Sequence, residues 1–188
     1  MKNKKSVDCV VVTYNRLSLL KECIQAVKNQ TYPIEHFFVI DNCSTDETWK
    51  YLQSIKNEKI FSIRLHKNMG GAGGFNIGLK TFIKQSISNY VWIMDDDTIP
   101  STTALENIMK KVNISAKVGF LCSNVRWRDK SVAIMNIPSP AKNWNEYSEA
   151  GVTKVNSASF VSIVFSREVI NKVGYPITDF FIWGDDVE

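Results

Sequence analysis

Three consecutive aspartates, Asp95, Asp96 and Asp97, directly follow the apolar run at residues 90–94. Adjacent carboxylates repel one another and lower stability unless a cation neutralises them. Residues i and i+2 of an extended chain point to the same side, so Asp95 and Asp97 could hold a hard divalent cation, Mg²⁺ or Mn²⁺, with positions left open for phosphate oxygens. The other interpretation is an exposed acidic turn in which Asp97 helps to cap the next helix.

Polar residues also follow the first two apolar runs of strand length. Asp41 comes directly after the run at residues 37–40, where a carboxylate can accept hydrogen bonds from a base or a ribose. It could equally form a turn ahead of a helix cap at Ser44. The run at residues 9–12 is followed by four candidate ligand contacts, namely Thr13, Tyr14, Asn15 and Arg16.

A glycine-rich segment at residues 68–76 is expected to form a turn ahead of a helix. Glycines allow close backbone approach, and a helix N-terminus favours anions, so the segment is a candidate phosphate contact. The other interpretation is a tight loop that needs positive φ angles. The segment lacks both the dinucleotide fingerprint and a Walker lysine. Its candidate binding residues are Asn68, Gly70, Gly71, Gly73 and Gly74.

The last six residues carry a second acidic cluster, in which Asp185, Asp186 and Glu188 stand beside Trp183. Aromatic and apolar neighbours at residues 180–182 can raise a carboxyl pKa toward the range that suits a general base. A solvated acidic turn is the alternative interpretation.

These residues need a scaffold, and the sequence predicts one from alternating strand and helix patterns. The fold class is α/β, with a mostly parallel central sheet flanked by helices on both faces. Carboxyl ends of parallel strands share one edge of a sheet, so Thr13, Asp41 and Asp95 are expected to lie close together. Strands are expected at residues 9–12, 37–40, 60–65, 90–94, 118–122 and 157–165.

Local signals predict where the intervening helices begin. Asn15 is expected to cap the first helix, and a capping box that opens at Ser44 is expected to start the second. A later helix is expected to follow Pro100, and a short one to cover residues 167–173. The regular alternation stops between residues 124 and 156, where we expect a hairpin and an irregular insertion.

Composition narrows the class of protein. The 188 residues, 44% hydrophobic and 22% charged, suit a single globular domain over residues 1–188. No apolar run approaches the ~20 residues of a membrane span, and no signal peptide is evident, so a cytoplasmic location is expected. The net charge of +4 is spread along the chain, which does not indicate a nucleic-acid partner. Four scattered cysteines are expected to be free thiols.

In this order, the motifs resemble those of the family-2 glycosyltransferases of the GT-A (Rossmann-like) fold. The resemblance covers nearly the whole chain, from residues 10–16 through residues 41–46 and the three aspartates to the late acidic pair. Residues 68–75 together with residues 183–188 resemble the galactofuranosyltransferase and rhamnosyltransferase branch.

The resemblance implies a role for each matching position. Thr13 and Asp41 would contact the base and ribose, and residues 68–74 would lie near the diphosphate or donor sugar. Asp95 and Asp97 would hold Mn²⁺ or Mg²⁺ on the diphosphate, with Asp96 beside the sugar or ribose. The catalytic base would be Asp186, supported by Asp185, and acceptor contacts would come from Trp183 and Glu188.

The implied activity is metal-dependent, inverting transfer of a sugar from a UDP- or dTDP-linked donor to a hydroxyl of a glycan or glycolipid. Such a protein would serve cell-surface polysaccharide synthesis, with at most peripheral association with the inner face of the membrane. Aromatic residues near 127–147 could form a homodimer contact or an acceptor groove. Family members continue beyond the acidic pair with acceptor-binding helices, and often with a metal-binding histidine, so we expect the chain to be truncated at its C-terminus.

Three other functions stay open from the sequence. A haloacid-dehalogenase-type phosphatase also has aspartates after an apolar strand, but that strand normally comes first in its sheet. A nucleotidyltransferase usually carries a glycine-rich loop after the first strand, and residues 13–16 contain no glycine. A module that binds a nucleotide sugar without transferring it would share the donor site.

Overall fold

The apolar run near the N-terminus forms the central strand β1 (Val7–Thr13), in which every residue is buried. The computed structural model describes residues 5–182. Strand β1 pairs in parallel with β2 (Phe37–Asp41) on one side and with β4 (Tyr90–Asp95) on the other. Burial on both faces explains why these strands read as continuous apolar runs.

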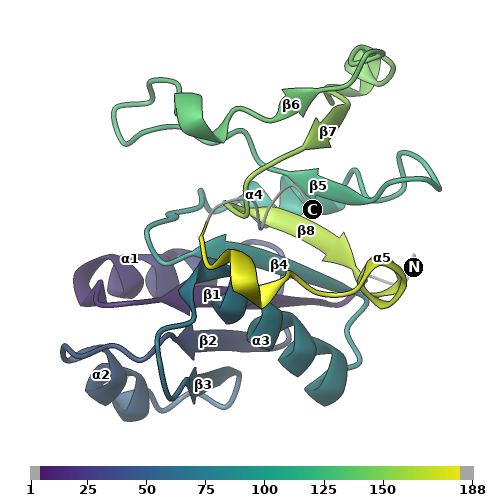
Figure 1. The fold of residues 1–188 in the computed structure, drawn as a ribbon. Helices are drawn as coiled ribbons and strands as arrows, with labels where there is room; N and C mark the ends of the chain where they lie inside the picture. The colour runs from purple at the N-terminus through teal and green to yellow at the C-terminus, as the bar shows by residue number, and fades with distance from the viewer. Residues whose placement is uncertain (1–4, 183–188) are drawn as a thin grey trace.

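Three more strands complete a six-stranded sheet of order β3-β2-β1-β4-β8-β5 (Figure 1). Strand β3 (Ile60–Arg64) pairs in parallel with β2, whereas β8 (Ile163–Ser166) pairs antiparallel with both β4 and β5 (Phe120–Cys122). The mostly parallel sheet expected from the sequence is therefore confirmed.

Helices cover both faces of this sheet, as predicted. One face carries α1 (Leu17–Lys28), α2 (Thr48–Ser54) and α4 (Ala104–Met109), which pack against alternate residues of β1 such as Cys9 and Val11. The other face carries α3 (Gly70–Gln85) and α5 (Arg167–Val173), which pack against Val10 and Val12. Figure 1 shows α3 lying across its face of the sheet.

The segment between β5 and β8 forms an arm that projects from the sheet (Figure 1). It contains the short antiparallel pair β6 (Ser139–Pro140) and β7 (Val155–Ser157), with single turns η1 (Ile134–Asn136) and η2 (Ser148–Ala150). The hairpin and irregular insertion are thus confirmed. The continuous strand expected over residues 157–165 is wrong, because β7 ends at Ser157 and β8 begins at Ile163.

Both predicted helix caps are also wrong, for one shared reason. Helix α1 begins at Leu17 without a side-chain cap, and Asn15 has a φ of 54° with its Oδ1 accepting from the backbone N–H of Thr45 at 2.7 Å. Helix α2 begins only at Thr48, and the Ser44 hydroxyl accepts from the N–H of Asn15 at 3.0 Å. The two side chains therefore bind the facing loop instead of capping their own helices.

The cysteines are free thiols, as expected. Burial raises the pKa of the Cys9, Cys23 and Cys122 thiols, which keeps them protonated and poorly reactive. Within residues 5–182, no helix combines the length and the hydropathy that crossing a membrane requires.

Candidate functional site

The registers of β1 with its two neighbours bring three polar strand ends together. Thr13 is the Cα partner of Asp41 in β2, and the preceding residue, Val12, is the partner of Asp95 in β4. The three ends therefore lie side by side at the carboxyl edge of the sheet, where open α/β sheets bind their ligands. This arrangement is the one predicted from the sequence.

Asp96 joins the loops that follow β1 and β4. Its side chain is buried, and its Oδ2 accepts from the Thr13 hydroxyl at 2.7 Å and from the N–H of Tyr14 at 3.4 Å. Burial raises the pKa of Asp96, and the Thr13 hydrogen bond and the Arg16 guanidinium oppose that rise. Asp96 thus fixes the first loop of the site against the acidic triplet.

The exposed end of the acidic triplet is paired with a positively charged side chain of the protein, that of Arg16. Arg16 donates to Asp97 Oδ2 at 2.7 Å and lies 3.5 Å from Asp96 Oδ1. About half of the Arg16 and Asp97 side-chain surfaces is exposed (52% and 46%). Both charged groups can therefore leave this ion pair and bind a ligand instead. A guanidinium binds phosphate as readily as carboxylate.

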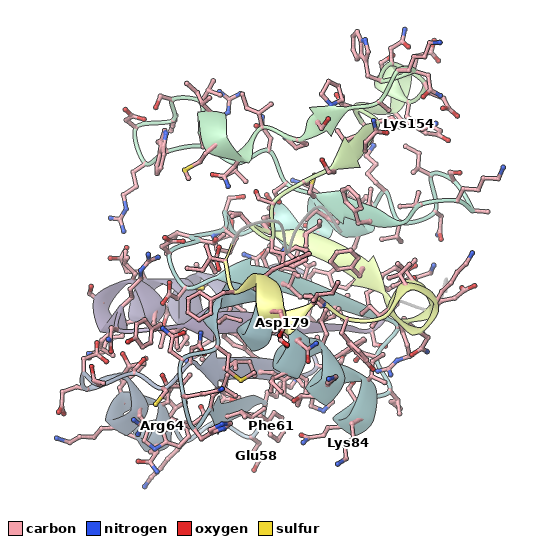
Figure 2. All side chains as sticks on the ribbon, viewed as in Figure 1. Glu58, Phe61, Arg64, Lys84, Lys154 and Asp179 are labelled. Carbon is pink, nitrogen blue, oxygen red and sulfur yellow. The ribbon has the colours of Figure 1, made fainter. Side chains whose placement is uncertain are left out.

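Asp41 is fully buried and is held from two directions. Its Oδ1 accepts from the N–H of Ser44 at 3.0 Å, and its Oδ2 lies 3.5 Å from Nε of Arg64. Arg64 also donates to the carbonyl of Ser44 at 2.7 Å and lies over the Trp49 ring. Figure 2 shows Arg64 at the β3 side of the sheet. Among residues 5–182, Asp41 Oδ2 has no hydrogen-bond donor, so it keeps an unused acceptor.

The metal-binding prediction can be tested against the donor set. Across the described part of the chain, no group of three or more His, Cys, Asp or Glu side chains is arranged to hold a metal ion. Asp95 and Asp97 nevertheless supply hard carboxylate oxygens, and Asp97 already binds the cationic Arg16. Strand β4 ends at Asp95 and residues 96–97 form a turn, so the extended backbone expected across the pair is not found. The carboxylate chemistry still fits a Mg²⁺ or Mn²⁺ ion whose remaining ligands are phosphate oxygens or water, and metal binding by the pair stays a prediction.

The expected glycine turn is wrong, because α3 begins at Gly70 and includes Gly71, Gly73 and Gly74 in its first turns. Asn68 precedes the helix and accepts from the N–H of Gly70 at 2.9 Å. Glycine has low helix propensity, so tertiary packing must favour the helix here.

Close packing explains why two of these positions are occupied by glycine. A Cβ on Gly74 would lie 2.4 Å from Cγ1 of Val12, and a Cβ on Gly70 would lie 2.0 Å from the carbonyl oxygen of Phe181. The helix therefore packs directly on β1 and on the segment before the acidic C-terminus. One N–H group of the first helical turn already has a partner, because the N–H of Ala72 donates to the carbonyl of Phe181 at 3.1 Å.

Sequence reasoning missed Asn42, which follows Asp41 and is buried. Its amide nitrogen donates to the carbonyl of Gly70 at 2.9 Å, and its oxygen accepts from the N–H of Met69 at 2.8 Å. The signal available in the sequence was an asparagine directly after a strand-ending aspartate. The candidate residues Trp183, Asp185, Asp186 and Glu188 lie outside the described residues, so their roles stay predictions.

Replacing Thr13 by valine is expected to lower the free energy of unfolding by about 1.5–3 kcal/mol, because buried Asp96 loses its shortest charge-assisted hydrogen bond. Urea unfolding at neutral pH measures this change. Thr13→Ser keeps the hydroxyl and is the matched control, expected to retain most of the stability. A stable Thr13→Val together with a destabilised Thr13→Ser would show that the methyl group, rather than the hydrogen bond, stabilises this loop.

Known proteins resemble this chain over most of its length. The sequence profile described as Glycosyl transferase family 2 matches residues 8–174. Galactofuranosyltransferase GlfT1 of Mycolicibacterium smegmatis is 25% identical over 200 residues, covering 100% of this chain and 65% of its own length. The UDP-Glc:alpha-D-GlcNAc-diphosphoundecaprenol beta-1,3-glucosyltransferase WfaP of Escherichia coli is 24% identical over 173 residues, covering 92% and 65% respectively.

Solved structures show the same fold. A mannosyltransferase from Pyrobaculum calidifontis, in complex with GDP-Man and Mn²⁺, aligns with a TM-score of 0.67 at 19% identity, over 99% of this chain and 51% of that one. TarS of S. aureus, in complex with UDP, aligns with a TM-score of 0.69 at 16% identity, over 97% and 53%. The chain spans less than two thirds of the length of each of these four proteins.

Neither alternative enzyme class is favoured. Strands β1, β2 and β3 all precede the aspartates at the end of β4, unlike the first-strand aspartate of the phosphatases. The profile match covers well over half of the chain and includes the whole carboxyl edge described above. This chain belongs to glycosyl transferase family 2 and has the GT-A fold.

Proposed function

We propose that this protein transfers a sugar from a nucleoside-diphosphate sugar to a hydroxyl group of a cell-surface glycan or glycolipid, with a divalent metal ion and with inversion of the anomeric centre. The observation that carries the proposal is the register of β1 with β2 and β4, which gathers Thr13, Asp41 and Asp95 at one edge. Family membership supports the choice of glycosyl transfer for a site of this shape.

The donor nucleotide is expected to bind along this edge. Asp41 Oδ2 is ion-paired with Arg64 but accepts no hydrogen bond within residues 5–182, so it is suited to accept one from the base or ribose, and Thr13 lies beside Asp41 across the sheet. Arg16 lies at the exposed end of the acidic triplet, where it can pair with a phosphate once a metal ion takes its place on Asp97. Asp95 and Asp97 would hold that ion. When bound, Mn²⁺ or Mg²⁺ offsets the negative charge that develops on the departing diphosphate.

The acceptor side of the site is expected to come from the C-terminal acidic cluster. Asp186 would take the proton from the acceptor hydroxyl, and Asp185 would support it or hold the acceptor. Trp183 and Glu188 would contact the acceptor. The hydroxyl oxygen attacks the anomeric carbon from the face opposite the diphosphate, so one displacement inverts the centre and no protein nucleophile is needed.

The names of the relatives support a choice of donor and acceptor class. The printed names include a galactofuranosyltransferase and a glucosyltransferase that uses UDP-Glc and a diphosphoundecaprenol-linked acceptor. We therefore favour a UDP-linked hexose, in the pyranose or furanose form, over a dTDP-linked rhamnose. A lipid-linked acceptor would place the protein at the inner face of the membrane, by peripheral association. Dimerisation through the exposed aromatic residues of the arm, such as Trp127 and Trp144, belongs to the same proposal.

Calorimetric titration with UDP, dTDP and GDP, each with Mn²⁺ and with chelator, tests the donor site. UDP is expected to bind in the presence of Mn²⁺ and to bind much more weakly in the presence of chelator. Release of UDP from UDP-sugars, with and without hydroxyl acceptors, then tests transfer. A folded protein that binds none of the nucleotides would contradict the proposal. A protein that binds UDP tightly but transfers to none of a varied set of acceptors would instead favour a silent binding module.

A further inference from the structure

The segment at residues 176–182 is fastened to the first turns of α3 by two hydrogen bonds. The side-chain amide of Asn76 donates to the carbonyl of Pro176 at 2.7 Å, and the N–H of Ala72 donates to the carbonyl of Phe181 at 3.1 Å. The turn η3 (Thr178–Phe180) lies between these two anchors, and Figure 2 shows its Asp179 beside α3. A segment that ends directly before the acidic cluster is thus attached to the glycine-rich helix.

Asn76 is specialised for this attachment. Its side chain is buried, and within residues 5–182 its Oδ1 has no hydrogen-bond partner. A buried amide with an unpaired oxygen is unfavourable, so the bond from its nitrogen to Pro176 must offset that cost. Gly70 serves the same contact, because only a residue without a Cβ at this position lets the Phe181 carbonyl approach the helix.

The backbone at Phe181 is strained, which indicates that the contact determines its conformation. Phe181 has φ 62° and ψ −65°, and the N–H of Ile182 closes a three-residue turn on the carbonyl of Phe180 at 2.7 Å. This turn is rare in residues other than glycine. Such a conformation persists only where the surrounding structure holds it, and here the holding groups are Gly70 and Ala72.

The same helix turn is bonded to the nucleotide edge of the sheet. Asn42, the neighbour of Asp41, holds both the N–H of Met69 and the carbonyl of Gly70. A continuous series of contacts therefore runs from the end of β2 through Gly70 to Phe181. Asp186 follows Phe181 by five residues, so covalent geometry keeps the two within about 18 Å of each other.

We propose that Asn76 is a positioning residue, which with Gly70 and Asn42 fixes the chain entering the acidic pair relative to the bound donor nucleotide. This inference rests on the proposed function, since it assumes that the acidic pair acts on the acceptor. Its mechanism is orientation: displacement of a reacting group by about 1 Å can lower the rate about 100-fold without removing any catalytic atom. Asn76 itself touches neither substrate.

The test compares the wild type with Asn76→Ala, which removes the bond to Pro176 without adding atoms. The amide of Ala72 is expected to exchange hydrogen faster, and kcat is expected to fall about 100-fold, while the Kd for UDP with Mn²⁺ changes less than about twofold. Thr81→Ala is the matched control, because it removes the hydrogen bond that the Thr81 hydroxyl donates to the carbonyl of Ile77 within α3. This variant should leave the exchange rate at Ala72, kcat and the Kd for UDP unchanged.

Urea unfolding of Asn76→Ala and of Thr81→Ala guards against misfolding, because a loss of kcat in an Asn76→Ala protein that is folded under the assay conditions is not a folding defect. Unchanged exchange at Ala72 in Asn76→Ala, or faster exchange with normal kcat, would overturn the positioning role. A rise in the Kd for UDP that matches the loss of kcat would also overturn it, because the effect would then be on donor binding. A wild type that turns over no substrate would contradict the proposed function itself, which separates the two failures.

Discussion

Replacing Asp95 and Asp97 together by asparagine is expected to weaken Mn²⁺-dependent binding of UDP by on the order of 100-fold or more, equivalent to about 2.7 kcal/mol. Asparagine preserves the shape of each side chain but removes the negative charge that a divalent ion requires of its carboxylate ligands. Binding measured with chelator should change much less, since the contacts of the base and ribose are left in place. Calorimetric titration of both proteins, with Mn²⁺ and with chelator, gives the comparison.

Stability provides a check that this loss is local. The double variant relieves repulsion between adjacent carboxylates but loses the half-exposed Arg16–Asp97 pair, so it is expected to be about as stable as the wild type when no metal is present. Glu149→Gln, which neutralises one exposed carboxylate on the arm, is the matched control for charge and should bind UDP normally. An unchanged Mn²⁺-dependent Kd in the double variant would exclude Asp95 and Asp97 as metal ligands.

The sheet was predictable because burial on both faces leaves an unambiguous mark. Residues 9–12 and 37–40 are short, continuous apolar runs, which are typical of a strand covered on both faces, and each forms a strand with neighbours on both sides. The position of the site followed from topology alone, since parallel strands must end at the same edge. Thr13, Asp41 and Asp95 could therefore be placed together without knowledge of any contact.

The errors share a physical cause, which is competition between local and tertiary partners. Asn15 and Ser44 have the side chains of helix caps, but in the structure they bind across the loops that join β1 to α1 and β2 to α2. Residues 70–74 are rich in glycine, which is typical of a turn. In the structure, the absence of a Cβ at Gly74 and Gly70 instead lets α3 pack on Val12 and Phe181. Propensity and spacing describe neighbours in the chain, so they carry no information about these partners.

The hydrogen-bonded details of the site were unpredictable for the same reason. Thr13 with Asp96, and Asn42 with Gly70, join residues far apart in the sequence, and each pairing depends on the register of a strand. The sequence does not mark Arg64 as a site residue, because an arginine at the end of a strand is common on protein surfaces. Only the fold shows that its guanidinium lies against the buried carboxylate of Asp41.

Replacing Asp186 by asparagine is expected to lower kcat by roughly 10²–10⁴-fold, the range that a positioned general base contributes. The isosteric amide cannot accept the proton from the acceptor hydroxyl, whereas donor binding at the carboxyl edge of the sheet should be unaffected. Initial rates at saturating donor and acceptor measure the loss, and titration with UDP and Mn²⁺ confirms an intact donor site. The same assays on Asp185→Asn should show a smaller loss, with a larger effect on the KM of the acceptor.

The comparison between these two neighbouring carboxylates decides their roles. A greater loss of kcat in Asp185→Asn than in Asp186→Asn would reverse the assignment, and equal losses would indicate that the pair shares one proton and acts as a unit. The anomeric configuration of the wild-type product, measured by nuclear magnetic resonance, tests the mechanism independently. Inversion agrees with a base that activates the acceptor in a single displacement. Retention would require either a nucleophile on the protein or attack from the face that the diphosphate leaves, and the proposed role of Asp186 would then be wrong even if its substitution abolished activity.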